Sequence, residues 1–177
     1  MTSHPKDFGN ELIQVMANGK NICAHLHLPV QSGSDEILRR MNRHYTTAEY
    51  RRHVEDLRSA IPDVSITTDL IVGFPGETEE LFEQTLSFVS EMKFDAAFTF
   101  LYSKRSGTPA ADMEEQIPQS VKQSRLQRLM DLQNDIAVSL NQRWVGREVD
   151  VLVDGPSKTD PTVYSGRTSQ NKIVLWP

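Results

Sequence analysis

Three groups of polar residues in this chain each follow an apolar run and together could bind a small ligand. They span residues 31–35, residue 69 with 73–78, and residues 102–108. If the apolar runs are parallel strands, the three groups lie at or near the carboxyl ends of neighbouring strands. Repeated β/α folds place their ligand sites at that edge. The sequence therefore predicts one site built from three strand ends.

The side chains in these groups suit a ligand that contains a nucleoside and a carboxylate. The amide of Gln31 both donates and accepts hydrogen bonds, which suits an amino acid moiety or a ribose. Arg43 could form a two-pronged bond to a carboxylate. Asp69 could accept hydrogen bonds from ribose hydroxyls, and a carboxylate in an apolar strand costs free energy unless a polar group meets it. Each residue alone could equally be a helix cap or a structural hydrogen bond, but together they favour a nucleoside-and-carboxylate pocket.

Metal chemistry is weakly indicated. His25 and His27 share one face of a predicted strand, a spacing that can bind a metal, but no third ligand is identifiable. Cys23 is the only cysteine, which excludes an internal disulfide and any site that needs several cysteines of this chain. We therefore assign no metal ligand, and Cys23 is expected to be a small buried apolar residue beside a strand.

Composition indicates a globular domain. With 177 residues and 38% hydrophobic content, the chain can form one core, or one core and a small satellite domain. It has no apolar run of membrane-spanning length and no secretory signal in residues 1–20, so we expect a cytoplasmic protein without a membrane partner. The net charge is −5, but residues 137–177 hold five Lys/Arg against four acidic residues. The tail is thus the likelier surface for an anionic partner.

Hydrophobic periodicity predicts an α/β fold with parallel strands, because helical and strand patterns alternate. Helices are expected over 5–18, from 35 to about 41, and over 47–61, 78–92 and 120–144, and strands over 25–30, 65–74 and 95–102. Residues 103–117 are expected to form a long site loop. Beyond Gly146 the pattern alternates over 149–153, turns at 154–157 and resumes near 163–164 and 173–176. That is the start of an all-β module with too few strands for a closed barrel.

Five segments of the chain resemble the radical SAM methylthiotransferases. The segments are 2–8, 27–35, 69–78, 98–103 and 107–111, and the resemblance extends over the whole chain. The sequence at 29–34 favours the tRNA branch of the family over the ribosomal protein branch, which stays open as an alternative. Lys104 and Ser106 stand where prolines are common in the tRNA branch.

The resemblance implies a radical reaction on tRNA. A full-length parent enzyme would use S-adenosylmethionine and [4Fe-4S] clusters to add a methylthio group to C2 of N6-isopentenyladenosine 37 of its tRNA partner. By motif position, Gln31, Arg43 and Asp69 are similar to residues that contact S-adenosylmethionine. Ile71 and Gly73 lie in the segment that packs against the adenine. No catalytic residue is assigned.

The resemblance also implies domain boundaries and an incomplete enzyme. Residues 1–139 are similar to the carboxyl-terminal half of a partial radical SAM (β/α) barrel, and residues 140–177 to an incomplete all-β TRAM (OB-like) domain that binds RNA. Since the cluster cysteines are absent, we expect a fragment that needs the missing amino-terminal part of the enzyme and is inactive alone. The alternative is a non-catalytic module that binds RNA or a protein partner. A half-barrel would expose strand edges that pair or aggregate unless covered.

Overall fold

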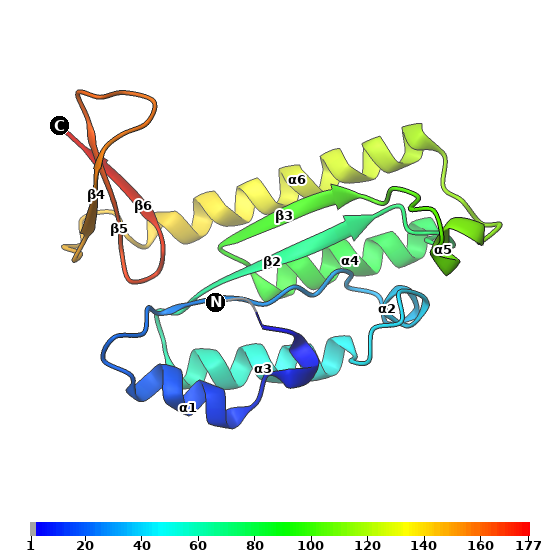
Figure 1. Ribbon diagram of the computed structural model, residues 1–177, viewed down its shortest axis with the longest axis horizontal. Coiled ribbons are helices and arrows are strands. Elements are labelled where there is room, and N and C mark those ends of the chain that lie inside the picture. The colour runs from blue at the N-terminus through cyan, green and yellow to red at the C-terminus, as the bar shows by residue number, and fades with distance from the viewer. Residues whose placement is uncertain (1–2) are drawn as a thin grey trace.

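The computed structural model describes residues 3–177 and contains two three-stranded sheets joined through one long helix (Figure 1). In chain order, the elements of the first part are the 3-10 helix η1 (Pro5–Asp7), α1 (Asn10–Asn18), β1 (His25–His27), α2 (Asp35–Arg40), α3 (Thr47–Ala60), β2 (Ser65–Val72), α4 (Glu79–Met92) and β3 (Ala96–Leu101). The remaining elements are α5 (Pro109–Asp112), α6 (Gln119–Gln142), β4 (Leu152–Pro156), β5 (Tyr164–Arg167) and β6 (Ile173–Trp176).

The first sheet is parallel and is covered by helices on one face only. Its strand order is β1-β2-β3, and both pairings are parallel. Alternate residues of β2 are buried, including Ile66, Leu70 and Val72, while Thr67, Asp69 and the next alternate residue are partly exposed. Helix α6 contacts β2 and β3, and α4 packs against α6. Figure 1 shows α4 and α6 behind β2 and β3 and α1 and α3 below them, so no helix of the described residues covers the face towards the viewer, called the open face below. The predicted α/β class with a parallel sheet is confirmed.

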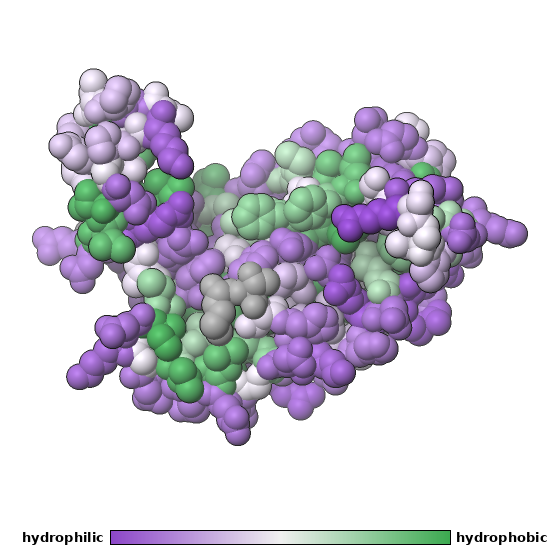
Figure 2. Space-filling model, viewed as in Figure 1, coloured by the Kyte–Doolittle hydropathy of each residue, from purple (hydrophilic) through white to green (hydrophobic). Residues whose placement is uncertain are grey.

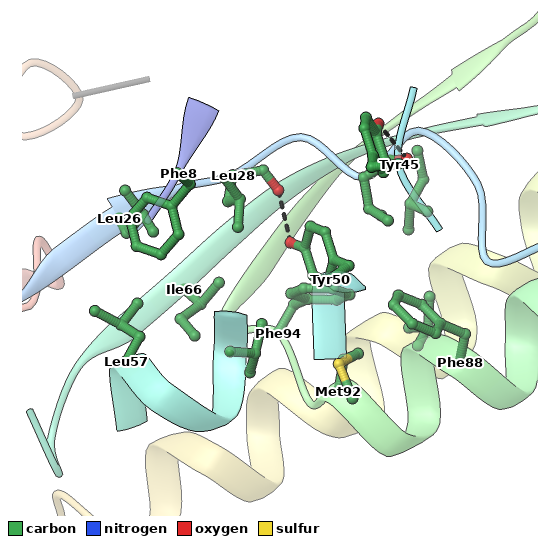
Figure 3. Packing of buried hydrophobic residues seen from close by; sticks show 14 of the residues in the cluster. Phe8, Leu26, Leu28, Tyr45, Tyr50, Leu57, Ile66, Phe88, Met92 and Phe94 are labelled. Atoms are coloured by element: carbon green, nitrogen blue, oxygen red, sulfur yellow. Dashed lines mark hydrogen bonds between the residues drawn. The ribbon is translucent and has the colours of Figure 1, made fainter. Parts of the chain in front are cut away.

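Side-chain hydrogen bonds from the core interrupt the backbone pairing with β2 after Leu28, whose N–H still donates to the Thr67 carbonyl at 2.8 Å. The hydroxyl of buried Tyr50 donates to the Leu28 carbonyl at 2.7 Å (Figure 3). Pro29 has no N–H to donate to a ladder, and the N–H of Val30 donates to Oγ1 of Thr68 at 2.9 Å. Strand β1 therefore ends at residue 27, and the prediction of a strand over 25–30 was too long.

Three other predicted elements differ from the structure. The helix expected over 5–18 is two helices, because buried Phe8 and the extended Gly9 separate η1 from α1. The site loop 103–117 contains the short helix α5. The turn expected at 154–157 falls largely within β4, which pairs with β5 through an irregularity between Val153 and Gly155.

The second sheet, the β module (residues 152–176), is antiparallel in the order β4-β5-β6. Nζ of Lys172 lies 2.9 Å from Oδ1 of Asp95, at the start of the last parallel strand, and donates to Oδ1 of Asn141 at 2.9 Å. These contacts place the module at the amino ends of the parallel strands, away from their carboxyl edge (Figure 1). Apolar surface lies along β3 and at the base of the module (Figure 2). None of the helices over residues 3–177 has both the length and the apolar character needed to cross a membrane.

Candidate functional site

Gln31 occupies the edge of the parallel sheet in an unfavourable backbone conformation. Its φ is +70°, a left-handed conformation that costs a residue other than glycine about 1–2 kcal/mol. Its N–H donates to the Asp69 carbonyl at 2.8 Å, and its carbonyl accepts from the N–H of Ile71 at 2.9 Å. The side-chain amide makes no hydrogen bond to any residue in 3–177. Backbone strain of this kind is concentrated at ligand sites, so the amide is held at this edge at a cost in stability.

The loop that carries Gln31 is fixed against α4 through a glycine. The N–H of Gly33 donates to Oγ1 of Thr85 at 3.2 Å, and the Ser32 hydroxyl lies 3.3 Å from the same oxygen. A Cβ atom on Gly33 would lie only 2.7 Å from the Cα of Thr85. Only glycine allows this close approach, which explains the residue type at this position of the predicted motif.

Asp69 projects from β2 onto the open face and meets a histidine. Its side chain is 27% exposed, and Oδ1 lies 3.4 Å from Nε2 of His27. His27 and His25 both contact Oγ1 of Thr67, at 3.0 and 3.2 Å. Burial lowers the pKa of His25. The polar partner that the sequence required for Asp69 is thus His27, which sequence reasoning weighed only as a metal ligand.

Gly73 forms the turn at the carboxyl end of β2, and two α6 residues hold this turn. Its φ is +75°, and a Cβ atom here would lie 2.4 Å from Cγ of Lys122. Its N–H donates to Oε1 of Glu77 at 2.9 Å. Nη1 of Arg125 donates to the same oxygen at 2.9 Å and to the Glu77 carbonyl at 2.8 Å. Burial raises the pKa of Glu77, and the Gly73 N–H and the Arg125 charge oppose that rise.

Sequence reasoning assigned no individual role to Glu77, Lys122 or Arg125. Glu77 entered only as a member of the polar group 73–78, and the two basic residues lie in the predicted helix over 120–144. The glycine pair before Glu77 could have revealed its role, because the free N–H groups of a turn with two glycines need acceptors.

Arg43 lies beside the same edge with a free donor. Its Nε is buried without a hydrogen-bond partner among residues 3–177. It lies near Tyr45, whose hydroxyl donates to the carbonyl of Val30 at 3.0 Å, one residue before Gln31. Burial raises the pKa of Tyr45 to about 12, and the charge of Arg43 opposes the rise.

Ile71 and the start of the third polar group, Tyr102, complete the edge. Ile71 pairs with Phe100 of β3 and is partly exposed. Tyr102 donates its N–H to the Val72 carbonyl at 2.8 Å, and its carbonyl accepts from Nζ of Lys122 at 3.1 Å. The structure thus brings the three predicted polar groups to one edge, with Gln31 and Asp69 joined directly through their backbones.

Sequence comparison places this chain in a family. A family model described as the Radical SAM superfamily matches residues 1–89. The chain belongs to the radical SAM superfamily. Among curated relatives, a tRNA-2-methylthio-N(6)-dimethylallyladenosine synthase of Moorella thermoacetica is 55% identical over 177 residues, covering 100% of this chain and 40% of the relative. The protein of the same name from Carboxydothermus hydrogenoformans is 54% identical over 175 residues, covering 99% of this chain and 40% of the relative.

These relatives confirm the resemblance to methylthiotransferases, and the chain spans about 40% of their length. Solved structures support the radical SAM fold. Coproporphyrinogen III oxidase (HemN) of Escherichia coli, described as a radical SAM enzyme, superposes with a TM-score of 0.64 at 19% identity over 95% of this chain and 45% of that one. The archaeal Methanocaldococcus infernus Elp3, with its N-terminus deleted, gives 0.58 at 12% identity over 98% of this chain and 54% of that one.

The residues of this radical SAM chain fit one of the two groups that the superfamily uses. For S-adenosylmethionine, the edge offers the Gln31 amide, the Asp69 carboxylate and the Nε of Arg43, which is buried without a partner among residues 3–177. For an iron–sulfur cluster, the chain offers one cysteine, Cys23. It is exposed, so the prediction that it is buried was wrong. Residues 3–177 contain no group of three or more His, Cys, Asp or Glu that could hold a metal. The residues present therefore fit the cofactor and do not fit a cluster.

Proposed function

We propose that this chain is the carboxyl-terminal part of a tRNA methylthiotransferase and forms one wall of its S-adenosylmethionine site. The observation that carries the proposal is the strained Gln31, whose backbone is hydrogen-bonded to Asp69 and Ile71 at the carboxyl edge of a radical SAM sheet. The relatives, at 54–55% identity, carry the name of the tRNA enzyme, which favours this branch over the ribosomal protein branch. The parent enzyme would add a methylthio group to C2 of N6-isopentenyladenosine 37 in tRNA, in the cytoplasm.

Each residue of the edge has a role set by its chemistry. The Asp69 carboxylate accepts from the ribose hydroxyls, and Arg43 donates to the carboxylate of the methionine moiety. The Gln31 amide bonds to the amino acid or the ribose, while Ile71 and the flat Gly73 backbone pack against the adenine. The bound cofactor supplies a 5′-deoxyadenosyl radical when a reduced cluster cleaves it. The cluster ligands must come from another part of the enzyme.

The missing amino-terminal part of the enzyme is the partner we propose for the open face. We interpret residues 1–139 as the carboxyl-terminal half of the partial barrel. Its open face presents Phe98 and Phe100, which are 58% and 50% exposed, although side chains on the inside of a barrel are normally packed. The rest of the barrel would cover these rings, and the 40% coverage of the relatives leaves ample chain for it.

Residues 140–177 are proposed to be an incomplete TRAM domain that contacts RNA. A cavity of about 810 Å³ separates the β module from the open face and is lined by Trp144, Arg147, Arg167 and Lys172 among others. Aromatic and basic side chains together suit stacked bases and phosphates. The eight residues of β2 span roughly 25 Å at about 3.3 Å each. A tRNA that reaches the cofactor edge from the module must bridge that distance.

Nucleoside mass spectrometry of tRNA tests the proposed activity. The full-length protein that contains this chain is expected to convert isopentenyladenosine in tRNA to its 2-methylthio form. The Asp69→Asn variant should lower this conversion by more than tenfold, because a ribose loses a charged acceptor worth about 1.5–3 kcal/mol. Modification of a ribosomal protein with unmodified tRNA would overturn the branch assignment.

RNA binding by this chain alone discriminates the non-catalytic alternative. Titration of tRNA from about 50 to 200 mM salt should show binding that weakens steeply, because phosphate contacts release counterions. Arg147→Gln with Arg167→Gln should flatten that salt dependence. RNA binding by the chain together with wild-type activity of a full-length protein that lacks residues 140–177 would show that the module does not serve the enzyme.

A further inference from the structure

Four polar side chains form a continuous row on the open face of β1 and β2. Nε2 of His25 lies 3.2 Å from Oγ1 of Thr67, and Nδ1 of His27 lies 3.0 Å from the same oxygen. Nε2 of His27 then lies 3.4 Å from Oδ1 of Asp69, within ion-pair range. The parallel register that pairs His27 with Thr67 brings these groups together. The row leads from the cavity under the β module to the proposed nucleoside site.

When both imidazole rings are neutral, the donors and acceptors along the row can be arranged in only one order. An ionised carboxylate only accepts hydrogen bonds, so the His27 nitrogen that faces Asp69 carries the proton. A neutral ring protonated at Nε2 has a lone pair at Nδ1, and the Thr67 hydroxyl donates to it. The Thr67 oxygen still has a lone pair, which accepts the Nε2–H of His25. The tautomers of both rings thus follow from the network.

Packing holds the His27 ring in the orientation that this direction requires. The ring of Phe98 lies edge-on to the imidazole, with centroids 5.8 Å apart and planes at 75°. The side chain of His27 is only 17% exposed. With Thr67 on one side and Phe98 on another, the ring has little freedom to turn its Nε2–H away from Asp69.

We propose that His27 is a positioning residue of the S-adenosylmethionine site and acts through Asp69. This inference rests on the proposed function, in which Asp69 accepts from the ribose of the cofactor. Nε2 of His27, 3.4 Å from Oδ1 of Asp69, would orient this oxygen and leave Oδ2 for the ligand. Thr67 and His25 contribute to the orientation of Asp69 indirectly, because they fix the tautomer of His27. A ring nitrogen fixed in this way is a common means of orienting a ligand-binding group.

Binding measurements on the protein variants test the role of His27. Titration calorimetry with S-adenosylmethionine is carried out on the full-length protein that contains this chain, with its cluster reconstituted, and in parallel on the 177-residue chain. His27→Phe should weaken binding about tenfold, the equivalent of about 1.4 kcal/mol. His27→Gln should stay within about threefold of wild type, since its amide N–H can still donate to Asp69. His44→Gln is the control, because His44 is exposed and has no part in the row.

The tautomer of His27 is a second readout, which tests the row of contacts directly. Long-range proton–nitrogen NMR of the nitrogen-15-labelled chain, at about pH 8.5 and so above the ordinary histidine pKa of about 6.5, should show His27 protonated at Nε2 and bare at Nδ1. Thr67→Val keeps the side-chain shape and removes the hydroxyl. It should shift His27 to a mixture of tautomers.

The outcomes separate this inference from the function on which it rests. If the wild-type proteins bind no S-adenosylmethionine, the proposed function fails and the inference fails with it. If wild type binds and His27→Phe binds equally well, or His27 carries its proton at Nδ1, only the inference is overturned. Loss of binding in both His27→Phe and His27→Gln would also overturn it, because the donor to Asp69 would then not explain the effect.

Discussion

Replacing Arg125 by methionine removes one half of a buried ion pair that closes the turn at Gly73. The side chains of Arg125 and Glu77 are 6% and 1% exposed. Nη1 of Arg125 lies 2.9 Å from Oε1 of Glu77, the oxygen that also accepts the N–H of Gly73. Truncation of one partner of a buried pair leaves an uncompensated charge and costs about 3–5 kcal/mol. For a domain of this size we expect the melting temperature to fall by roughly 6–20 °C.

Two further variants test whether the buried charge causes the loss of stability. Arg128→Met is the matched control, since Arg128 comes from the same helix and pairs with Glu79 and Glu83 but is 40% exposed. Its loss should cost no more than about 1 kcal/mol. Glu77→Gln combined with Arg125→Met should recover most of the lost stability, because the amide still accepts from Gly73 and no buried charge remains.

The loss of unfolding free energy in Arg125→Met should also depend on pH. Burial raises the pKa of Glu77 above its ordinary 4.5, so the folded protein holds this proton more tightly than the unfolded chain. For such a group, stability falls as pH rises from the unfolded to the folded pKa. Loss of Arg125 removes one group that opposes the rise, so the folded pKa of Glu77 increases further and the fall extends to higher pH. Urea unfolding at about pH 5 and pH 8, followed by circular dichroism, should show the larger deficit at pH 8. Equal deficits at both values, or equal effects of Arg125→Met and Arg128→Met, would refute the reasoning.

Three other substitutions have expected outcomes that unfolding experiments can check. Gly73→Ala should cost at least about 1–2 kcal/mol for the positive φ, and adding Lys122→Ala should recover only the further loss due to the 2.4 Å contact. Gln31→Gly should leave stability unchanged or raise it by up to about 1 kcal/mol, because relief of strain outweighs the entropy cost of glycine, while S-adenosylmethionine binding weakens. Thr46→Ala should cost about 1 kcal/mol, since it removes the capping box at the start of α3; a loss below about 0.3 kcal/mol would contradict that account.

Local patterns in the sequence were sufficient to predict most elements of the fold. Helices were predicted from residues 47 and 78, and the residues that cap them, Thr46 and Thr78, both accept a backbone N–H three residues on. The apolar run after Ser65 gave a strand, and its alternate burial follows from the pleat. The early end of β1 was foreseeable too, because Pro29 cannot donate to a ladder. These features depend on neighbours within a few residues.

The contacts that shape the site depend instead on residues far apart in the chain. His27 and Asp69 are separated by a helix pair, and the β1–β2 register decides that they meet. Arg125 reaches Glu77 only because α6 packs back along the sheet. The left-handed φ of Gln31 is imposed by its two hydrogen bonds to β2. No local propensity favours that conformation for glutamine.

Helix α6 connects the carboxyl edge of the parallel sheet to the β module and fixes their separation. Lys122 and Arg125, near its first turn, hold the Tyr102 and Gly73 ends of the parallel strands. Asn141, in its last turn, accepts from Lys172 of the module. The helix has 24 residues and is therefore about 36 Å long. Because both ends are held by side-chain contacts, the helix acts as a spacer of set length. In the proposed enzyme, RNA on the module would thus be held at a set distance from the edge formed by Gln31 and Asp69.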